Sequence, residues 1–131
     1  MADERRPDDP TIPDASRLFR RISPSHVVPG EDGKTRPSTA AFKDAELSVN
    51  IESLMIPLGR APEKLIERHP GFALASILAG EVRVLGPEYP IVKDTEPPND
   101  PDHGLVLGKK GKAFVKPVSR QCLWVIPPRE V

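Results

Sequence analysis

Residues 46–52 read Glu-Leu-Ser-Val-Asn-Ile-Glu, and this stretch decides the fold class. Polar and apolar side chains alternate through it, which is the two-residue period of a β-strand. The three apolar side chains therefore lie on one face of the strand, and Ser48 and Asn50 lie on the other. A strand with one polar face is typical of a sheet that covers a core on one side and meets water or a ligand on the other.

Five other apolar stretches predict further short strands. Four of them are bounded by turn residues, charges or proline: residues 17–22, 105–107, 113–115 and 122–126. The fifth, residues 72–79, is apolar almost throughout, so periodicity alone does not separate a buried strand from a buried helix. We expect a strand there, because a Pro-Gly pair precedes the run and a glycine follows it.

Three further segments predict a helix, a pairing strand and a loop. Residues 61–69 predict a short helix, with a proline in its first turn and a Pro-Gly pair after its last residue. Residues 81–85 alternate weakly, which predicts a strand that pairs back through a turn at Gly80, with a short helix as the alternative. Residues 29–38 hold two prolines and two glycines and predict a surface loop.

Together these segments predict an α+β fold, a single small domain with an antiparallel or mixed sheet of short strands and one or two short helices. The 131 residues are too few for two ordinary domains. The chain has no run of about 18 apolar residues, so no transmembrane helix is predicted. The charged first residues lack the apolar stretch of a signal peptide, so none is expected there. The single cysteine, Cys122, excludes a disulfide framework, so a cytoplasmic location is expected.

Residues 1–16 carry seven charged residues and three prolines, with Ile12 as their one large aliphatic residue. Such a segment buries too little apolar surface to offset the entropy cost of ordering it. We therefore expect residues 1–16 to be a disordered or loosely docked arm. Residues 17–131 are expected to form the single α+β domain, with an acidic, proline-rich loop at 94–103.

Charge is divided sharply in the second half of the chain, although 19 basic and 19 acidic residues give a formal net charge of zero. Residues 94–102 hold only acids among their charged side chains, and residues 104–120 hold only bases. This division favours a small accessory or protein-interaction domain that docks to another protein through a charged surface. The expected partner-binding residues are Lys109, Lys110, Lys112 and Lys116. Alternatively, the acidic loop neutralises the basic segment within the fold.

A second alternative is binding of a polyanion such as nucleic acid through residues 109–120. The zero net charge and the few aromatic residues count against it. The glycine–lysine stretch at 108–112 lacks the spacing of a phosphate-binding loop, which needs a glycine where Val106 stands and Ser or Thr where Ala113 stands. The three histidines stand far apart in sequence, so neither a metal site nor a cofactor is predicted.

The candidates for catalysis are Arg20 or Arg21 on the opening strand, Ser38, Glu81 and His103. An early strand arginine, followed about twenty residues later by a Ser-Thr pair, resembles the ADP-ribosyltransferase-like and RES-toxin group. The resemblance implies that the arginine contacts the diphosphate of NAD, that Ser38 shapes the nicotinamide pocket and that Glu81 completes the site. Arginine does form forked hydrogen bonds with phosphate, and a carboxylate can hold a ribose hydroxyl.

His103 is a candidate on different grounds, because it opens a predicted strand directly after a long loop, where functional residues often lie. Whether the chain is an enzyme stays open on these residues. Three stretches, residues 18–28, 36–51 and 100–110, are similar to a family of short uncharacterised bacterial proteins. That resemblance implies a single bacterial domain in the cytoplasm and carries no activity with it.

Overall fold

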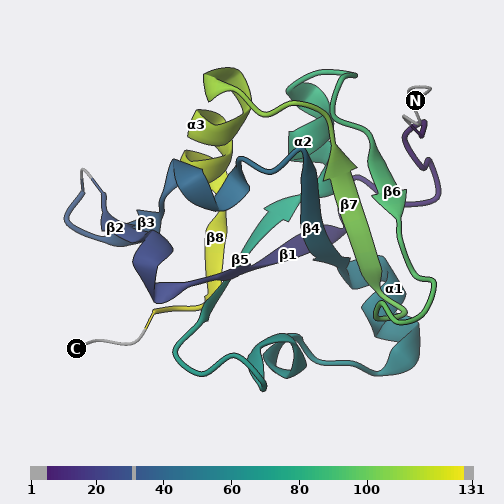
Figure 1. Ribbon diagram of the computed structural model, residues 1–131, viewed down its shortest axis with the longest axis horizontal. Coiled ribbons are helices and arrows are strands. Elements are labelled where there is room, and N and C mark those ends of the chain that lie inside the picture. Colours follow the sequence, from purple (N-terminus) through teal and green to yellow (C-terminus); the bar gives the residue numbers. More distant parts are fainter. Residues whose placement is uncertain (1–5, 31, 129–131) are drawn as a thin grey trace.

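The computed structural model describes residues 6–30 and 32–128 and has an α+β fold, as predicted (Figure 1). Its main sheet has six strands in the order β6-β7-β4-β1-β5-β8, and every neighbouring pair is antiparallel. The strands are β1 (Arg17–Ile22), β4 (Glu46–Ile51), β5 (Ala73–Leu78), β6 (Ile91–Lys93), β7 (His103–Leu107) and β8 (Leu123–Ile126). A separate hairpin pairs β2 (Val27–Pro29) with β3 (Thr35–Pro37).

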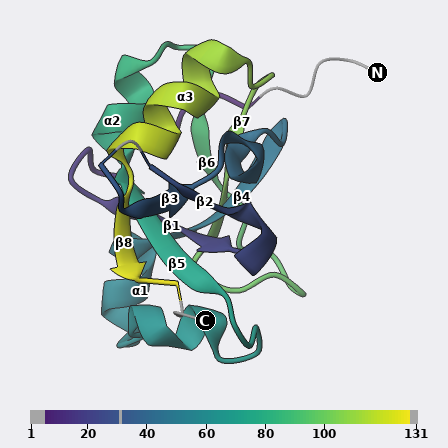
Figure 2. The ribbon, with the colours of Figure 1, turned by 90° about the vertical axis from the view of Figure 1, so that its left-hand side faces the viewer.

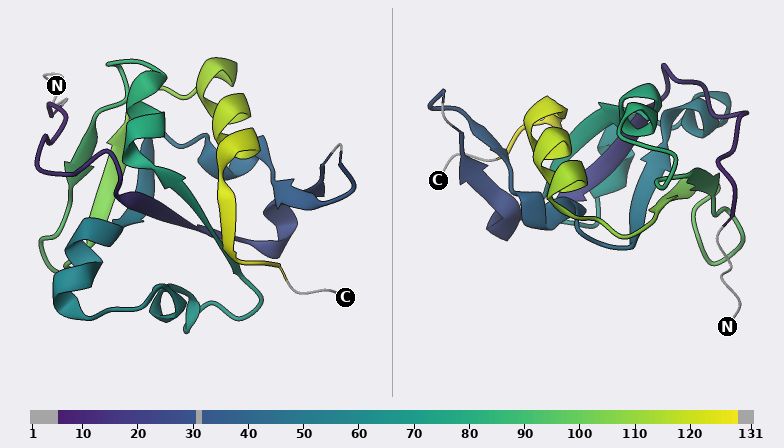
Figure 3. Two further views of the ribbon diagram at one scale, coloured as in Figure 1. Left: turned by 180° about the vertical axis from the view of Figure 1, so that it is seen from behind. Right: turned by 90° about the horizontal axis from the view of Figure 1, so that it is seen from above.

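Three α-helices accompany the sheet in the described residues: α1 (Glu52–Met55), α2 (Ala79–Val84) and α3 (Lys112–Gln121). Short 3-10 turns lie at Pro24–His26, Thr39–Phe42, Ile56–Leu58 and Pro62–Ile66. α2 and α3 lie at one end of the molecule, whereas α1 and the segment that leads from it to β5 lie at the other end (Figure 2 and Figure 3). No helix in the described part of the chain is long and apolar enough to cross a membrane.

The predicted strands at 17–22, 46–52, 72–79, 105–107 and 122–126 are confirmed within one or two residues at their ends. Two strand predictions are wrong. Residues 81–85 lie mostly in α2, the helical alternative, and residues 113–115 lie in α3. In α3 the apolar side chains of Phe114, Val115 and Val118 recur at helical spacing and are buried, so packing overrides the short apolar run. The helix predicted at 61–69 is reduced to a 3-10 turn.

One face of the sheet carries the main core. Leu47, Val49 and Ile51 of β4 are all at most 3% exposed, as the alternating pattern predicts. They pack in one cluster with Phe114 and Val118 of α3, together with side chains from α2, from the Thr39–Phe42 turn and from the amino-terminal arm. α3 therefore covers this face, and its apolar stripe sets which of its residues remain on the outside.

β1 and β4 pair only at Leu18–Ile51 and Phe19–Asn50 and then diverge. Arg20 fills the opening on the core side. Its Nε donates to the carbonyl of Ala41 at 3.1 Å and its Nη1 to the carbonyl of Ser48 at 3.1 Å. The guanidinium thus replaces hydrogen bonds that a neighbouring strand would supply.

The opposite face is covered at one end by the segment that follows β4. Phe19 and Leu74 on the sheet pack against Met55 and Leu65, and all four side chains are buried. Further along this face, a second small cluster is formed by Val92, Leu105 and Leu107. Gly104 lies where β6, β7 and β4 come closest, because a Cβ there would collide with the side chain of Ile51 and the carbonyl of Val92.

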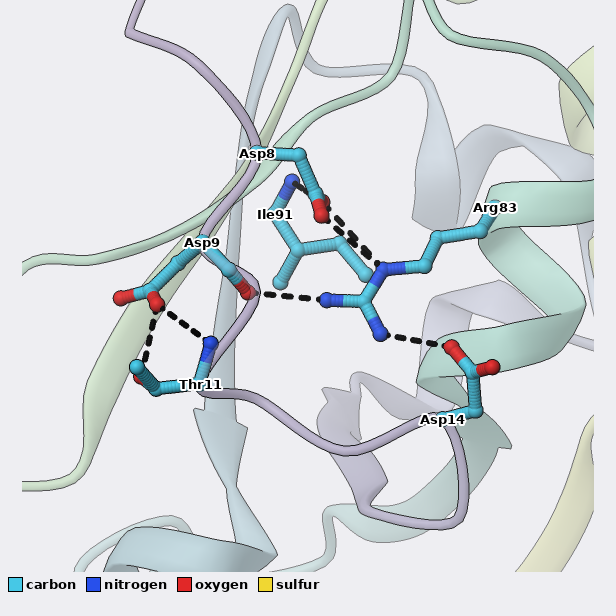
Figure 4. A network of polar contacts seen from close by, with 6 residues as sticks. All are labelled: Asp8, Asp9, Thr11, Asp14, Arg83 and Ile91. Carbon is cyan, nitrogen blue, oxygen red and sulfur yellow. Dashed lines mark hydrogen bonds and ion pairs between the residues drawn. The ribbon is translucent and has the colours of Figure 1, made fainter.

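Residues 6–16 belong to the segment that was expected to be a disordered or loosely docked arm, and they contact the rest of the fold at several points. Ile12 is 1% exposed within the main core. Arg83 of α2 donates to Asp8 at 3.1 Å, to Asp14 at 2.7 Å and to the carbonyl of Asp9 at 3.0 Å (Figure 4). The arm is held because one apolar anchor is combined with a multidentate arginine, which its composition does not reveal. The first five residues of the predicted arm lie outside the described part of the chain.

Candidate functional site

The five sequence-predicted catalytic candidates do not meet in one cleft. Arg20 and Arg21 are consecutive in β1 and project to opposite sides of the sheet. Ser38 accepts a hydrogen bond from the amide of Ala40 and caps a 3-10 turn, and Glu81 accepts one from the amide of Leu78 at the start of α2. These contacts are local and structural, and neither of the clefts described below is lined by two of the five.

His103 is joined to two residues that sequence reasoning missed. Its Nδ1 lies 3.1 Å from both the carbonyl oxygen and Oδ2 of Asp94, and its Nε2 lies 3.2 Å from Oγ of Ser48. Both Asp94 atoms accept hydrogen bonds, so Nδ1 carries the proton, and in the neutral ring Nε2 accepts from the Ser48 hydroxyl. The polar face of the predicted β4 strand was the only sequence signal for Ser48.

The order carboxylate, histidine and serine is that of a hydrolytic triad, yet the surroundings lack its other parts. Ser48 lies within β4, and its own carbonyl oxygen already accepts a hydrogen bond from Nη1 of Arg20. Ser48 also lines neither of the clefts described below. The contacts of His103 therefore tie β4 and β7 to the residue that follows β6, on the polar side of the sheet.

A wide, cation-lined cleft lies at the α1 end of the molecule. It has a volume of about 750 Å³ and is formed by the end of β1, by residues 58–69 and by the loop before β7. Its charged lining consists of Arg21, Arg60, Lys64, Arg68, Glu67 and Asp100, with His69 beside them. We call this feature the arginine cleft. Of its cationic residues, only Arg21 was a sequence-predicted candidate.

Arg60 is held in the arginine cleft by a buried carboxylate. Its Nη1 donates to both oxygens of Asp102, at 3.0 and 2.8 Å, and Asp102 is fully buried. Asn50 Nδ2 donates to the same carboxylate at 2.6 Å, and Asn50 is only 6% exposed. Burial alone would lower the pKa of Arg60, but the carboxylates of Asp102 and Asp100 raise it above its usual value. Arg60 is thus a fixed, permanently charged group.

Partial burial lowers the pKa of His69, and the nearby charge of Arg21 lowers it further. The effect of Arg21 arises because a nearby positive charge disfavours the protonated, charged form of His69. Lys64 pairs with Glu67 at 2.8 Å, and Arg21 donates through Nη1 to the carbonyl of Leu65 at 3.3 Å. The arginine cleft therefore holds more cationic than anionic side chains.

A second cationic surface lies on α3 at the other end of the molecule (Figure 1). Lys112, Lys116 and Arg120 are spaced four residues apart, so they form one stripe along the exposed side of the helix, and Lys109 precedes them. We call these four residues the basic face. All four are exposed, and none forms an ion pair with a carboxylate in residues 6–30 or 32–128.

Lys110 does not belong to the basic face, although it was expected among the partner-binding lysines. Its ammonium group donates to the carbonyls of Gly108, Val106, Asp44 and Ala45 at 2.6 to 3.2 Å. Burial lowers the pKa of Lys110 to about 8, so it remains mostly protonated at neutral pH. The lysine closes the turn between β7 and α3 from inside and offers little to a partner.

A groove of about 440 Å³ lies between the β2–β3 hairpin and the junction of α3 with β8. Arg120 lines it and so connects it with the basic face, and Lys34 and Arg36 add two more cations. Nε of Arg36 is buried without a hydrogen-bond partner among the described residues. Trp124 lines the same groove and donates through Nε1 to the carbonyl of Thr35 at 3.1 Å, and Leu123 beside it is 70% exposed. We call this feature the hairpin groove.

No group of three or more His, Cys, Asp or Glu side chains that could hold a metal ion occurs in the part of the chain that the structure describes. Comparison with known proteins gives no further assignment. No family model matches the chain, and neither a curated protein nor a solved structure resembles it significantly.

Proposed function

We propose that this protein is an accessory domain that binds an acidic segment of another protein through the basic face and the hairpin groove. The observation that carries the proposal is the stripe of Lys112, Lys116 and Arg120, because these cations have no carboxylate partner within the described fold. Exposed charges without partners favour encounter with a surface of opposite charge.

The hairpin groove supplies apolar and aromatic contacts, which the exposed charges of the basic face do not provide. Stable protein interfaces combine a polar rim with buried apolar or aromatic anchors. Leu123 is 70% exposed, and Trp124 lies beside it, immediately beyond the end of the basic stripe. The partner segment would therefore carry acidic side chains along α3 and an apolar side chain that covers Leu123 in the groove.

A protein partner is favoured over nucleic acid on two counts. The stripe from Lys112 to Arg120 is only about 12 Å long at the rise of an α-helix, which spans few phosphates. The hairpin groove at its end also contains Leu123 and Trp124, and contacts with a phosphate backbone alone would not use their apolar surface. Duplex DNA is nevertheless a useful competitor in the test.

The test uses Trp124, the single tryptophan of the chain, as a reporter within the groove. A synthetic peptide that alternates Glu and Leu residues is titrated at low salt while the emission of Trp124 is followed. We expect saturable binding that weakens as salt is raised, since exposed charges are screened over about 8–10 Å at physiological ionic strength.

Two variants locate the binding surface. Lys116→Glu reverses a charge on the basic face and should weaken binding roughly fivefold, the equivalent of about 1 kcal/mol for an exposed ion pair. Lys43→Glu reverses an exposed lysine outside the basic face and should leave binding unchanged. Equal losses in both variants, the absence of any Trp124 response, or tighter binding of duplex DNA than of the peptide would contradict the proposal.

A further inference from the structure

We propose that the arginine cleft is a second, independent binding site, which takes the phosphate group of a small phosphomonoester. The site lies at the α1 end of the molecule, whereas the basic face lies on α3 at the opposite end (Figure 1). The two proposals therefore rest on different residues and can fail separately.

Arg60 is preorganised to bind an anion. Asp102 has no solvent exposure, and it holds Nη1 of Arg60 with both of its oxygens while Asn50 orients the carboxylate from behind. Nε and Nη2 of Arg60 donate no hydrogen bond to the described residues. One side of the guanidinium is thus fixed by the protein, and the other side is left for a ligand. A group that is already immobilised loses little entropy when a ligand binds it.

The cations of the cleft come from separate parts of the fold. Arg21 is supplied by β1, Arg60 by the residues after the Ile56–Leu58 turn, and Arg68 by the residues after the Pro62–Ile66 turn. Within the described residues, Arg21 forms a hydrogen bond only through Nη1, to the carbonyl of Leu65. Three guanidinium groups around one space suit an anion with three or four acceptor oxygens, and a phosphate group has them where a carboxylate has two.

The arginine cleft also has room for the part of the ligand beyond the phosphate. A volume of about 750 Å³ lies within the range of clefts that hold small organic molecules, and it is far larger than a free phosphate ion requires. Leu58, which is 51% exposed, and Pro101 contribute apolar surface to the lining. The organic part of a phosphomonoester would lie against them.

The test is isothermal titration calorimetry of the full chain. The probes are glycerol 3-phosphate, adenosine monophosphate, inorganic phosphate and acetate, at matched ionic strength. We expect at least one phosphomonoester to bind more tightly than inorganic phosphate, and acetate to give no measurable heat. If no probe binds at millimolar concentration, or if acetate binds as well as the phosphates, the proposal is overturned. If inorganic phosphate binds as tightly as both esters, the ligand is the free ion and the phosphomonoester is ruled out.

Matched variants assign the heat to the cleft. Arg68→Gln removes an exposed cleft arginine that forms no ion pair or side-chain hydrogen bond with residues 6–30 or 32–128, and it should weaken binding about tenfold, because a charge-assisted hydrogen bond is lost. Arg120→Gln removes an exposed arginine of the basic face and should leave phosphomonoester binding unchanged. Arg60→Lys keeps a charge beside Asp102 but loses the fork, and it should also weaken binding.

The calorimetry of the arginine cleft is independent of the peptide titration of the hairpin groove. Arg68→Gln should leave peptide binding at Trp124 unaltered, so loss of phosphomonoester binding does not imply loss of peptide binding. Equal weakening of phosphomonoester binding by Arg68→Gln and Arg120→Gln would show unspecific attraction to positive charge and overturn the site. Unchanged binding in both Arg68→Gln and Arg60→Lys would overturn it as well.

Discussion

The acidic and the basic segments of this chain are used in opposite ways. Four carboxylates of the arm and of the loop at 94–102 are bound by arginines within the fold: Asp8 and Asp14 by Arg83, and Asp100 and Asp102 by Arg60. The basic segment leaves Lys109, Lys112, Lys116 and Arg120 exposed and directs only Lys110 inward. The acidic loop therefore does not neutralise the basic segment, although the two are almost adjacent in sequence.

A run of like charges in a sequence therefore predicts surface charge only where no oppositely charged side chain from elsewhere in the sequence pairs with it. Arg60 and Arg83 are isolated arginines in unremarkable sequence surroundings, and each one gathers two carboxylates. The arginine cleft and the basic face, at opposite ends of the molecule, each hold more cationic than anionic side chains, while the formal net charge is zero.

The largest effect is expected for Asp102→Asn, which removes a fully buried charge and leaves Arg60 without its main partner. Loss of one member of a buried ion pair costs about 3 kcal/mol, and urea unfolding should show that loss. Glu96→Gln removes an exposed carboxylate of the same loop and should change stability by less than about 0.5 kcal/mol. Similar values for the two variants would break the distinction between bound and free acidic side chains.

A smaller effect separates two adjacent lysines. Lys110→Met removes the donor that satisfies four main-chain carbonyls, and the expected loss is about 2 kcal/mol. Lys109→Met changes an exposed side chain of the same type and should have almost no effect on urea unfolding. If Lys110→Met unfolds like the wild type, Lys110 belongs with the exposed lysines after all.

Arg83→Gln tests the arm and should cost about 1 kcal/mol, since its ion pairs are partly exposed. Hydrogen exchange gives the sharper measurement. The amides of Asp9 and Ile12, which are hydrogen-bonded in the docked arm, should exchange faster in the variant than in the wild type. Arg68→Gln is the control, because Arg68 is exposed and distant from the arm in the fold. Unaltered protection in Arg83→Gln would mean that Ile12 alone holds the arm.

The smallest effect is predicted for the basic face. Replacing Lys112, Lys116 and Arg120 together by Gln should shift the free energy of unfolding by no more than about 0.5 kcal/mol, because none of them is paired in the described fold. Thermal and urea unfolding of the triple variant check this expectation. A loss above 1 kcal/mol would show that these cations stabilise the fold and are not reserved for a partner.

Sequence patterns predicted the elements whose burial is one-sided or complete. β4 has a strict alternation, and β5 has an apolar run bounded by Gly, so both were found. α3 was missed because Pro117 and two β-branched valines lower its helix propensity, and its stability comes from packing of Phe114 and Val118 on the sheet. The four-residue spacing of Lys112, Lys116 and Arg120 did indicate this helix. The interpretation of Ala113–Val115 as a strand concealed that signal.

The sites were less predictable than the fold. The basic residues of α3 were recognised as a surface, since exposed charge is a local property of the sequence. The arginine cleft was not, because Arg60 and Asp102 are 42 residues apart and neither lies in a motif. His103 was singled out by its position after a loop, but its partners Ser48 and Asp94 meet it only through strand pairing. Long-range pairing of this kind leaves no periodic trace in one sequence.

The docking of the arm has a consequence for how the chain acquires its structure during synthesis. Asp8 accepts a hydrogen bond from the amide of Ile91, which is 83 residues further along the chain. A ribosome that adds about 5–20 residues per second needs roughly 4 to 17 s to make that stretch. Until synthesis reaches Arg83, 69 residues after Asp14, the arm lacks its arginine partner, and the α3 side chains that pack in the same cluster as Ile12 follow later still. The arm is therefore made well before the residues that hold it in place, and its many charged side chains favour hydration until then.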